Sequence, residues 1–188
     1  MHTRFSLKPC FSLFAAAFLF IASVSAQPTV MVGGAAMIST KNIMENAANS
    51  KNHTTLVAAV KTAGLEQTLQ SSGPFTVFAP TNEAFNKLPA GTVETLLKPE
   101  NKAILTAILT YHVVPGKFNS ATLTDLIKKN AGKYTVKTVQ NEAITFTLKD
   151  KNIILHDEKG GMSKITIKDV YQSNGIIQVI DAVLMPKG

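Results

Sequence analysis

Apolar and polar residues follow two different periods along this chain, and the change comes near Gly132. Between residues 41 and 129, apolar side chains recur every three or four positions, which predicts short amphipathic helices. One such stripe, which ends at a glycine, consists of Leu56, Val57, Val60 and Ala63. After Gly132 the period falls to two, and threonines separate Ile144, Phe146 and Leu148. Helices followed by a meander of strands predict a single α+β domain, because repeating βαβ units would alternate the two patterns.

Two apolar runs add strands at either end of this order. In GPFTVFAPTNEAF, residues 73–85, an apolar strand ends at Pro80, and Thr81 or Asn82 is placed to cap a helix that buries Phe85. In NGIIQVIDAVLMP, residues 174–186, the β-branched run predicts a long central strand. Asn174-Gly175 before it favours a tight hairpin turn, because both residue types tolerate a positive φ.

The N-terminal 26 residues have the three parts of a secretory signal sequence. A short basic start and an apolar run precede Val24-Ser25-Ala26, whose residues are of the size a signal peptidase accepts. We therefore expect cleavage near Ala26 and a secreted chain, periplasmic or extracellular, with no membrane span after cleavage. Residues 27–38 are small and aperiodic, which predicts a flexible lead-in. Residues 39–186 form the predicted domain.

Composition narrows the chemistry of the mature chain. Cys10, the single cysteine, precedes the predicted cleavage site, so no disulfide or thiol nucleophile is expected. Residues 27–188 carry 17 lysines and 12 acidic residues, a formal charge of 17 − 12 = +5. The lysines are spread mostly singly, whereas a nucleic-acid site would need a basic stripe with aromatic residues. We expect a basic surface with some attraction to anionic polymers and no binding of nucleic acid.

Motifs for catalysis or metal binding are weak. His53, His112 and His156 are too far apart in sequence to suggest a zinc site. His156-Asp157-Glu158 is the one local cluster of potential ligands, and it reads as an exposed hairpin end. The turn at residues 79–82 has no glycine, unlike a phosphate-binding loop, and G-x-S-x-G is missing. The sequence predicts a protein that is not an enzyme and binds no cofactor.

Three motifs, taken in order, resemble the fasciclin-type domain family. They are GPFTVFAPTNEAF at residues 73–85, LTYHVVPG at 109–116 and NGIIQVIDAVLMP at 174–186. The resemblance is closest to small secreted bacterial members with one such domain, and it implies N-terminal helices packed around a β-wedge of mostly C-terminal strands. The motif residues for which we expect a structural role are Thr76, Phe78, Pro80, Thr81, Asn82, Phe85, His112, Asn174, Gly175, Gln178, Asp181 and Pro186.

The resemblance also implies a function in cell adhesion or in binding an extracellular matrix or surface. The partner would be a matrix or cell-surface protein or a polysaccharide. In related animal domains the Tyr-His element is linked to receptor binding. The candidate partner-binding residues are therefore Tyr111, His112, Val113, Val114 and Phe118, together with the loops around Asp157. A carrier of a small apolar ligand is the alternative, and it would need a sizeable apolar cavity.

Three polar motif residues carry specific expectations. We expect His112 to be at least half buried and hydrogen-bonded to a backbone or hydroxyl group, with Thr81 or Asn82 as possible partners. Gln178 stands where many fasciclin-type domains have a histidine, so this position cannot titrate here. Asp181 lies inside the predicted last strand, where it either points outward or anchors a buried hydrogen-bond network.

Overall fold

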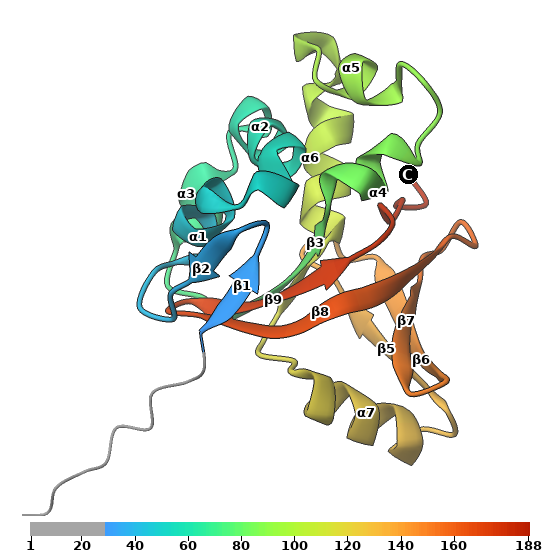
Figure 1. The fold of residues 1–188 in the computed structure, drawn as a ribbon. Coiled ribbons are helices and arrows are strands. Elements are labelled where there is room, and N and C mark those ends of the chain that lie inside the picture. Colours follow the sequence, from blue (N-terminus) through green and yellow to red (C-terminus); the bar gives the residue numbers. More distant parts are fainter. Residues whose placement is uncertain (1–28) are drawn as a thin grey trace, which may run out of the picture.

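A computed structural model describes residues 29–188, and the predicted signal sequence at residues 1–26 lies outside them. The order of elements follows the change of period, because helices dominate up to residue 129 and strands beyond it (Figure 1). The helices are α1 (Ile43–Asn49), α2 (Thr54–Ala63), α3 (Glu66–Gln70), α4 (Asn82–Asn86), α5 (Thr92–Leu96), α6 (Lys102–Tyr111) and α7 (Ser120–Lys129). Two 3₁₀ turns, η1 (Lys51–His53) and η2 (Pro99–Asn101), precede α2 and α6.

The strands form a small hairpin and a seven-stranded sheet. The hairpin pairs β1 (Val30–Val32) with β2 (Ala35–Met37). The sheet has the order β4-β3-β9-β8-β7-β6-β5. Its members are β3 (Phe75–Pro80), β4 (Val113–Pro115), β5 (Lys133–Lys137), β6 (Ala143–Lys149), β7 (Asn152–His156), β8 (Met162–Gln172) and β9 (Gly175–Ile180). In Figure 1 this sheet lies between α7 and the other helices.

Strands β3 and β9 lie at the centre, and every residue of β9 is buried. They pair in parallel from Phe75 opposite Gly175 to Pro80 opposite Ile180. All other pairs in the sheet are antiparallel. Strand β8 is long enough to pair with β9 at one end and β7 at the other, and two register shifts interrupt its pairing with β9. Because bulges bend a strand, β8 connects the half of the sheet around β3 and β9 to the half formed by β5–β7 at an angle, and the sheet takes the shape of a wedge.

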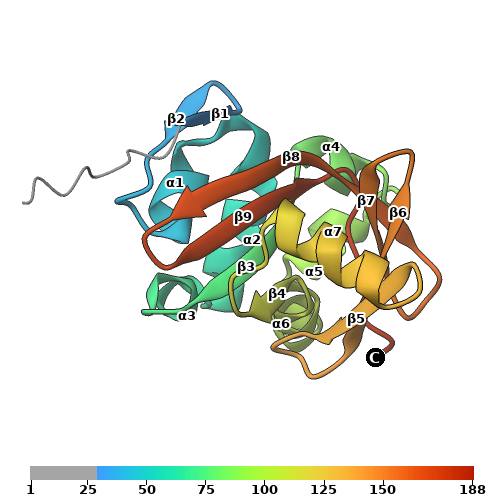
Figure 2. The same cartoon turned by 90° about the horizontal axis from the view of Figure 1, so that it is seen from below.

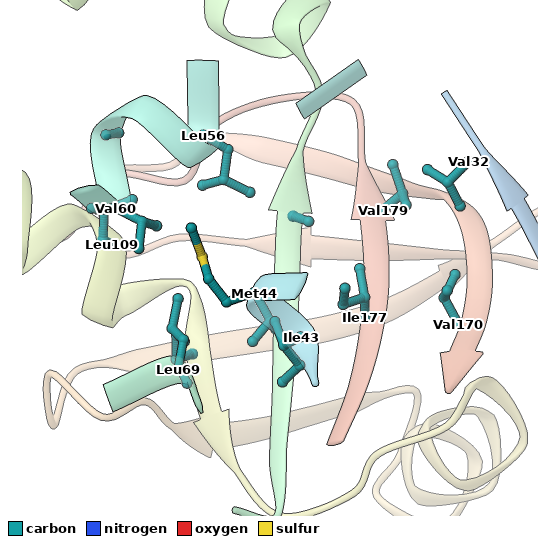
Figure 3. Packing of buried hydrophobic residues seen from close by; sticks show 14 of the residues in the cluster. Val32, Ile43, Met44, Leu56, Val60, Leu69, Leu109, Val170, Ile177 and Val179 are labelled. Atoms are coloured by element: carbon teal, nitrogen blue, oxygen red, sulfur yellow. The ribbon is translucent and has the colours of Figure 1, made fainter. Parts of the chain in front are cut away.

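Buried apolar residues fall into two groups on opposite sides of the central strands (Figure 3 shows part of the first). The helical core consists of Val32, Met37, Ile43, Met44, Leu56, Ala59, Val60, Ala63, Leu69, Val77, Ala79, Phe85, Leu105, Leu109, Val113, Val170, Ile177 and Val179. The strand core consists of Phe78, Tyr111, Val114, Leu123, Ile127, Val136, Ile144, Phe146, Ile153, Leu155, Ile165, Ile180 and Leu184. Successive residues Val77 and Phe78 enter different cores, since side chains alternate along a strand. The continuous apolar run of β3 is thereby explained.

The predicted flexible lead-in is wrong for residues 30–37, which form the hairpin of β1 and β2. Gly33 and Gly34 make its turn with positive φ values of 58° and 77°, which glycine adopts without steric cost. Val32 and Met37 are both buried in the helical core. In the sequence, the alternation of side chains that would predict these strands extends over only three residues in each strand. Such a short alternation cannot be distinguished from an aperiodic run.

The predicted long last strand ends earlier than expected. Pairing stops at Ile180, because the carboxylate of Asp181 accepts hydrogen bonds from the backbone N–H of Lys164 at 2.8 Å and from the hydroxyl of Ser163 at 3.2 Å. Asp181 therefore lies at the end of the strand, one residue beyond its ladder. Pro186 is nevertheless buried, so the tail after the strand remains packed on the domain.

A tight hairpin joins β8 to β9 where the sequence predicts one, with Gln172 opposite Gly175. The reason for Asn174 and Gly175 at this turn is not the expected tolerance of a positive φ, because neither residue has a positive φ. A Cβ on Gly175 would lie 2.1 Å from the carbonyl oxygen of Phe75, so glycine is required by the close approach of β3. Asn174 accepts a hydrogen bond from the Ile43 N–H and ties α1 to this turn.

Candidate functional site

The Tyr-His element lies where α6 ends and β4 begins. Tyr111 is the last residue of α6, and its side chain is fully buried in the strand core. Its hydroxyl donates a hydrogen bond to the carbonyl of Ala143 at 2.6 Å, which ties α6 to the start of β6. Burial raises the pKa of Tyr111, since the phenolate would lose its hydration. Tyr111 is thus a neutral structural donor in this conformation.

His112 lies on the other side, against the helical core. Its Nδ1 lies 2.8 Å from the carbonyl oxygen of Ile108, and its Nε2 accepts a hydrogen bond from the N–H of Leu184 at 3.0 Å. A carbonyl on one nitrogen and an N–H on the other fix the neutral ring with its proton on Nδ1. Burial lowers the pKa of His112 from 6.5 to about 4. The predicted burial and backbone bonding are therefore present.

The predicted partners Thr81 and Asn82 are wrong for His112, because both side chains serve helix α4 and its neighbours. The Thr81 hydroxyl accepts a hydrogen bond from the Ala84 N–H at 3.2 Å, which is the N-cap that the sequence predicts. Asn82 instead accepts from the Thr55 N–H at 3.0 Å and donates to the carbonyl of Lys51 at 2.9 Å. The motif after β3 thus joins α4 to the start of α2.

The rest of the candidate partner-binding segment is also held inward. Val113 and Val114 are buried, and Phe118 is half-buried against the strand core. The Thr76 hydroxyl donates to the carbonyl of Gly116 at 2.7 Å and accepts from the Phe118 N–H at 2.9 Å. Most of the segment is therefore out of reach of a partner in this conformation, and its role in binding remains a prediction.

Gln178 is fully buried and centres a polar network at the bulge of β8. Its amide nitrogen donates to Asp169 Oδ1 at 2.9 Å and to the Phe118 carbonyl at 3.1 Å, and its oxygen accepts from the Asp169 N–H at 3.0 Å. The backbone N–H and the hydroxyl of Ser120 both bind the Asp169 carboxylate. A glutamine offers two donors and an acceptor, and three of these bonds are made here. The network ties α7 to the central sheet without a titratable group at position 178.

The hairpin between β7 and β8 differs from the exposed end that the sequence predicts. Asp157 is only 9% exposed. Its carboxylate accepts hydrogen bonds from the N–H groups of Lys159 at 3.0 Å, Gly161 at 2.6 Å and Met185 at 2.9 Å. A buried carboxylate needs such partners, and here they close the turn and fasten the C-terminal tail. Glu158 next to it is exposed.

An apolar cavity lies inside the helical core, between α1, α2, α3, α6 and β3. Figure 3 shows Met44 reaching from α1 toward Val60 and Leu109, which line it. The centre of a water-sized sphere can move through about 70 Å³ of this space. Thr68 and Val139 on its border are exposed, so the cavity lies close to the surface. His112 also borders it, but both ring nitrogens are occupied by backbone groups.

The described part of the chain, residues 29–188, contains no group of three His, Cys, Asp or Glu side chains arranged to hold a metal ion. Within the same residues, none of the helices is long and apolar enough to cross a membrane.

The sheet gathers lysines that the sequence shows as isolated. On β5–β8 one side chain in two faces the strand core, and the residues between them face outward. We call these outward residues the Lys–Thr face, defined by Lys133, Thr135, Lys137, Thr145, Thr147, Lys149, Ile154, His156 and Lys164, with Ala143, Asn152 and Met162 at its border. The alternation of KYTVK was visible in the sequence, but the register across four strands was not.

Comparison with known proteins gives a family and a fold. The sequence profile of the Fasciclin domain matches residues 51–186. The protein sll1483 of Synechocystis sp. is 47% identical over 160 residues, which cover 85% of this chain and 82% of that protein. The immunogenic protein MPB70 of Mycobacterium bovis is 37% identical over 145 residues, 74% of this chain and 66% of that protein.

Among solved structures, a domain pair of the insect cell adhesion molecule fasciclin I has a similar fold. The TM-score is 0.69 at 17% sequence identity, and the match covers 79% of this chain and 52% of that chain. At this identity the likeness concerns the fold alone. The α+β arrangement of helices around a β-wedge is confirmed by it.

Proposed function

Because the chain belongs to the fasciclin domain family, we propose that it is a secreted, non-catalytic module that binds an extracellular-matrix or cell-surface component. The observation that carries this proposal is the internal use of the motif residues. The polar side-chain atoms of Tyr111, His112 and Gln178 are hydrogen-bonded to backbone groups or to a neighbouring carboxylate inside the domain. With those groups occupied, the surface is left as the part of the domain that meets a partner.

Similarity to an adhesion protein supports the same reading. Fasciclin I, whose domain pair shares the fold, is described as a cell adhesion molecule. The partner of this chain would be a matrix or cell-surface protein or a polysaccharide. Of the candidate partner-binding residues, Phe118 is the half-buried one, so we propose that it contributes a contact from the edge of the strand core.

A binding panel tests this proposal. The mature chain would be presented to matrix proteins, polysaccharides and whole cells at low and at physiological ionic strength. We expect selective binding that survives physiological salt, and weaker binding by Phe118→Ala than by Leu88→Ala, a matched change at a half-buried residue beside the helical core. If no member of the panel is bound selectively, the adhesion function is wrong.

The cavity in the helical core favours a second function, that of a carrier for a small apolar molecule. A site for one water needs roughly 10–15 Å³ on the same measure, so about 70 Å³ accommodates a molecule of a few heavy atoms. Pockets for drug-sized ligands are much larger, at about 300–1,000 Å³. Any cargo is therefore small.

Methyl NMR of the mature chain, with benzene as the probe, tests the carrier function. Met44 lines the cavity, whereas Met162 is 64% exposed and distant in the fold. We expect a saturable shift of the Met44 methyl signal and a constant Met162 signal. Native mass spectrometry of protein secreted by its own cells would then show whether a ligand is retained. Equal shifts at both methionines would contradict a specific site.

A further inference from the structure

The Lys–Thr face has a geometry that suggests what it binds. One row across the four strands runs from Lys133 through Thr147 and Ile154 to Lys164. The next row runs from Thr135 through Thr145 and His156 to the exposed Met162. With strands about 4.8 Å apart and about 3.3 Å per residue, the face measures about 14 by 20 Å.

Lysines stand around the rim of this face and hydroxyl groups lie at its centre. Lys133 and Lys164 mark its two sides, while Lys137 and Lys149 mark its two ends, and all four are exposed. At the centre, the hydroxyls of Thr135 and Thr145 are 2.9 Å apart, and the Thr147 hydroxyl is 2.8 Å from His156 Nε2. These bonds hold the hydroxyls in place, and each hydroxyl keeps further capacity for hydrogen bonds.

No carboxylate opposes the lysines on the face. Strands β5, β6 and β7, as described, contain no Asp or Glu, and the acid of β8, Asp169, is bound to Ser120 and Gln178. Asp150 and Glu158 lie in the hairpin turns beyond the strand ends. Within residues 29–188 the ion pair found joins Lys87 to Asp181, whose carboxylate also accepts a hydrogen bond from the backbone N–H of Lys164 at the border of the face. Among the described residues, no ion pair is found for the ammonium groups of the four lysines, so they are available to an anionic partner.

Most of the net positive charge lies in the segment that contains α7 and most of β5–β8, on both sides of these strands. Residues 117–168 contain ten lysines and five acidic residues, whereas residues 29–116 contain six lysines and five acidic residues. Helix α7 covers the opposite side of β5–β7, where Leu123 and Ile127 join the strand core. Figures 1 and 2 show these strands at one side of the molecule, with α7 on their inner side. The outward side is open to a large partner.

From this arrangement we propose that the Lys–Thr face binds an acidic polysaccharide, whose carboxylate or sulfate groups contact the lysines and whose hydroxyls contact the threonines. Opposite charges on two surfaces steer association and fix the partner's orientation. This inference rests on the proposed function and names its partner class and its surface.

Other macromolecules fit the face less well. A protein interface would have an apolar centre with aromatic residues, and the face offers only Ile154 at its centre. Single-stranded nucleic acids are held by bases stacked on aromatic side chains, and none stands outward here. A membrane-surface site would carry a cluster of apolar side chains for insertion, whereas this face offers only Ile154 at its centre and Met162 at its border, among threonines and lysines.

The test compares two variants with the same change of charge. The face variant is Lys133→Gln/Lys137→Gln/Lys149→Gln/Lys164→Gln. The control variant, Lys51→Gln/Lys61→Gln/Lys98→Gln/Lys102→Gln, removes four exposed lysines from the helical side. Mature wild-type and variant chains would be titrated by calorimetry with alginate for carboxylates, dextran sulfate for sulfates and dextran as the neutral polymer. Circular dichroism would verify that each variant is folded.

We expect the wild-type chain to bind one or both acidic polymers at physiological ionic strength and to ignore dextran. The face variant should bind roughly a hundredfold to a thousandfold more weakly, as expected for the loss of four lysines near an anionic surface. The control variant should stay within about twofold of the wild type. The alginate and dextran sulfate titrations distinguish carboxylate from sulfate recognition.

A second variant, Thr135→Val/Thr147→Val, keeps the β-branched shape and all charges but removes two hydroxyls. Weaker binding by this variant would show that the threonines contact the sugar. Amide NMR shifts on adding the polymer should concentrate in β5–β8.

Three outcomes would overturn the inference. They are equal losses in the two lysine variants, binding of duplex DNA or of phosphatidylserine vesicles as tightly as the polysaccharides, and no binding of either acidic polymer. If matrix proteins are still bound selectively in the last case, the proposed adhesion function stands while this surface assignment fails.

Discussion

The helical core encloses a cavity beside Met44, whereas the strand core packs Phe78 against Phe146 with ring centroids 5.4 Å apart. Among the described strand-core residues, Phe78 alone borders that cavity. The helical core is assembled from several short helices joined by turns, and the strand core from antiparallel hairpins closed by α7. The same sheet supports both.

This difference suggests a division of roles within the domain. Loosely filled space allows side chains to rearrange around a small molecule, while dense packing fixes the outward residues of the same strands. The Tyr-His element lies at the boundary, with Tyr111 in the strand core and His112 beside the cavity. A substitution of Tyr111 therefore disturbs the packing of the strand core, whereas a substitution of His112 disturbs the packing beside the cavity of the helical core.

The largest contrast is expected from truncating one large side chain in each core. Phe146→Ala should lower the free energy of unfolding by about 3–5 kcal/mol, because Phe146 is fully buried and closely packed. Met44→Ala should cost about 2 kcal/mol, since Met44 already lacks contacts on its cavity side. Guanidinium unfolding followed by circular dichroism measures both. A larger loss for Met44→Ala would contradict the difference in packing.

Acidification should weaken the helical core selectively. Because burial lowers the pKa of His112 from 6.5 to about 4, the unfolded chain binds more protons between these values. This contribution to stability is complete above pH 6.5, is lost as the pH falls toward 4, and amounts to about 3 kcal/mol. Burial also lowers the pKa of His53, which acts in the same direction.

Hydrogen exchange at pH 7 and pH 5 checks this prediction, after correction for the intrinsic rates. Amides of α2 and α6 should lose more protection at pH 5 than those of β6 and β7. His156→Gln, a change on the outward face, should leave the pattern intact and serves as the control. Uniform loss of protection would mean that the two cores respond as one unit.

Adding one methylene group to each core should change the free energy of unfolding by a smaller amount, and in opposite directions in the two cores. Val77→Ile on β3 extends a side chain that lines the cavity, so we expect a change from neutral to about 1 kcal/mol of stabilisation. Val114→Ile on β4 extends a side chain that is 1% exposed in the strand core, and should cost about 1–3 kcal/mol. Both sites are valines in paired strands, so strand propensity cancels in the comparison. Similar losses at both would show that the cavity is not free to accept atoms.

Removing the Tyr111 hydroxyl gives the smallest expected effect. Tyr111→Phe deletes one hydrogen bond to Ala143 and keeps the ring, which should cost about 0.5–1.5 kcal/mol. Thermal unfolding followed by circular dichroism measures the loss, with Tyr134→Phe on β5 as the control. A neutral result would show that the ring alone holds α6 to the strand core.

The sequence predicts these features to the extent that they are local. The period of two after Gly132, the cap at Thr81 and the burial of His112 all depend on near neighbours, and the structure has each of them. The Leu184 partner of His112 escaped prediction, because Leu184 lies 72 residues further along and only the tertiary fold brings it close. The stop of β9 at Ile180 likewise depends on Lys164, a residue of another strand.

The Lys–Thr face shows the same limit on a larger scale. Lysines on β5, β6 and β8 come onto one face through strand register, which a single strand does not encode. The cavity was equally invisible, since it depends on how the volumes of α1, α2 and α6 fill the space over β3. Resemblance to a family supplied the fold, but the motifs that carry it are mostly interior residues.

Parallel pairing of β3 with β9 has a consequence for the order in which the domain is made. Phe75 lies opposite Gly175, so the inner edge of β3 has no partner until a segment 100 residues further along the chain has been synthesised (175 − 75 = 100). A chain that is still growing therefore cannot complete either core, and contacts so distant in sequence also slow folding. The growing chain therefore stays incompletely folded until β9 has been made. Loss of that strand by premature termination would leave the centre of the sheet as an open edge.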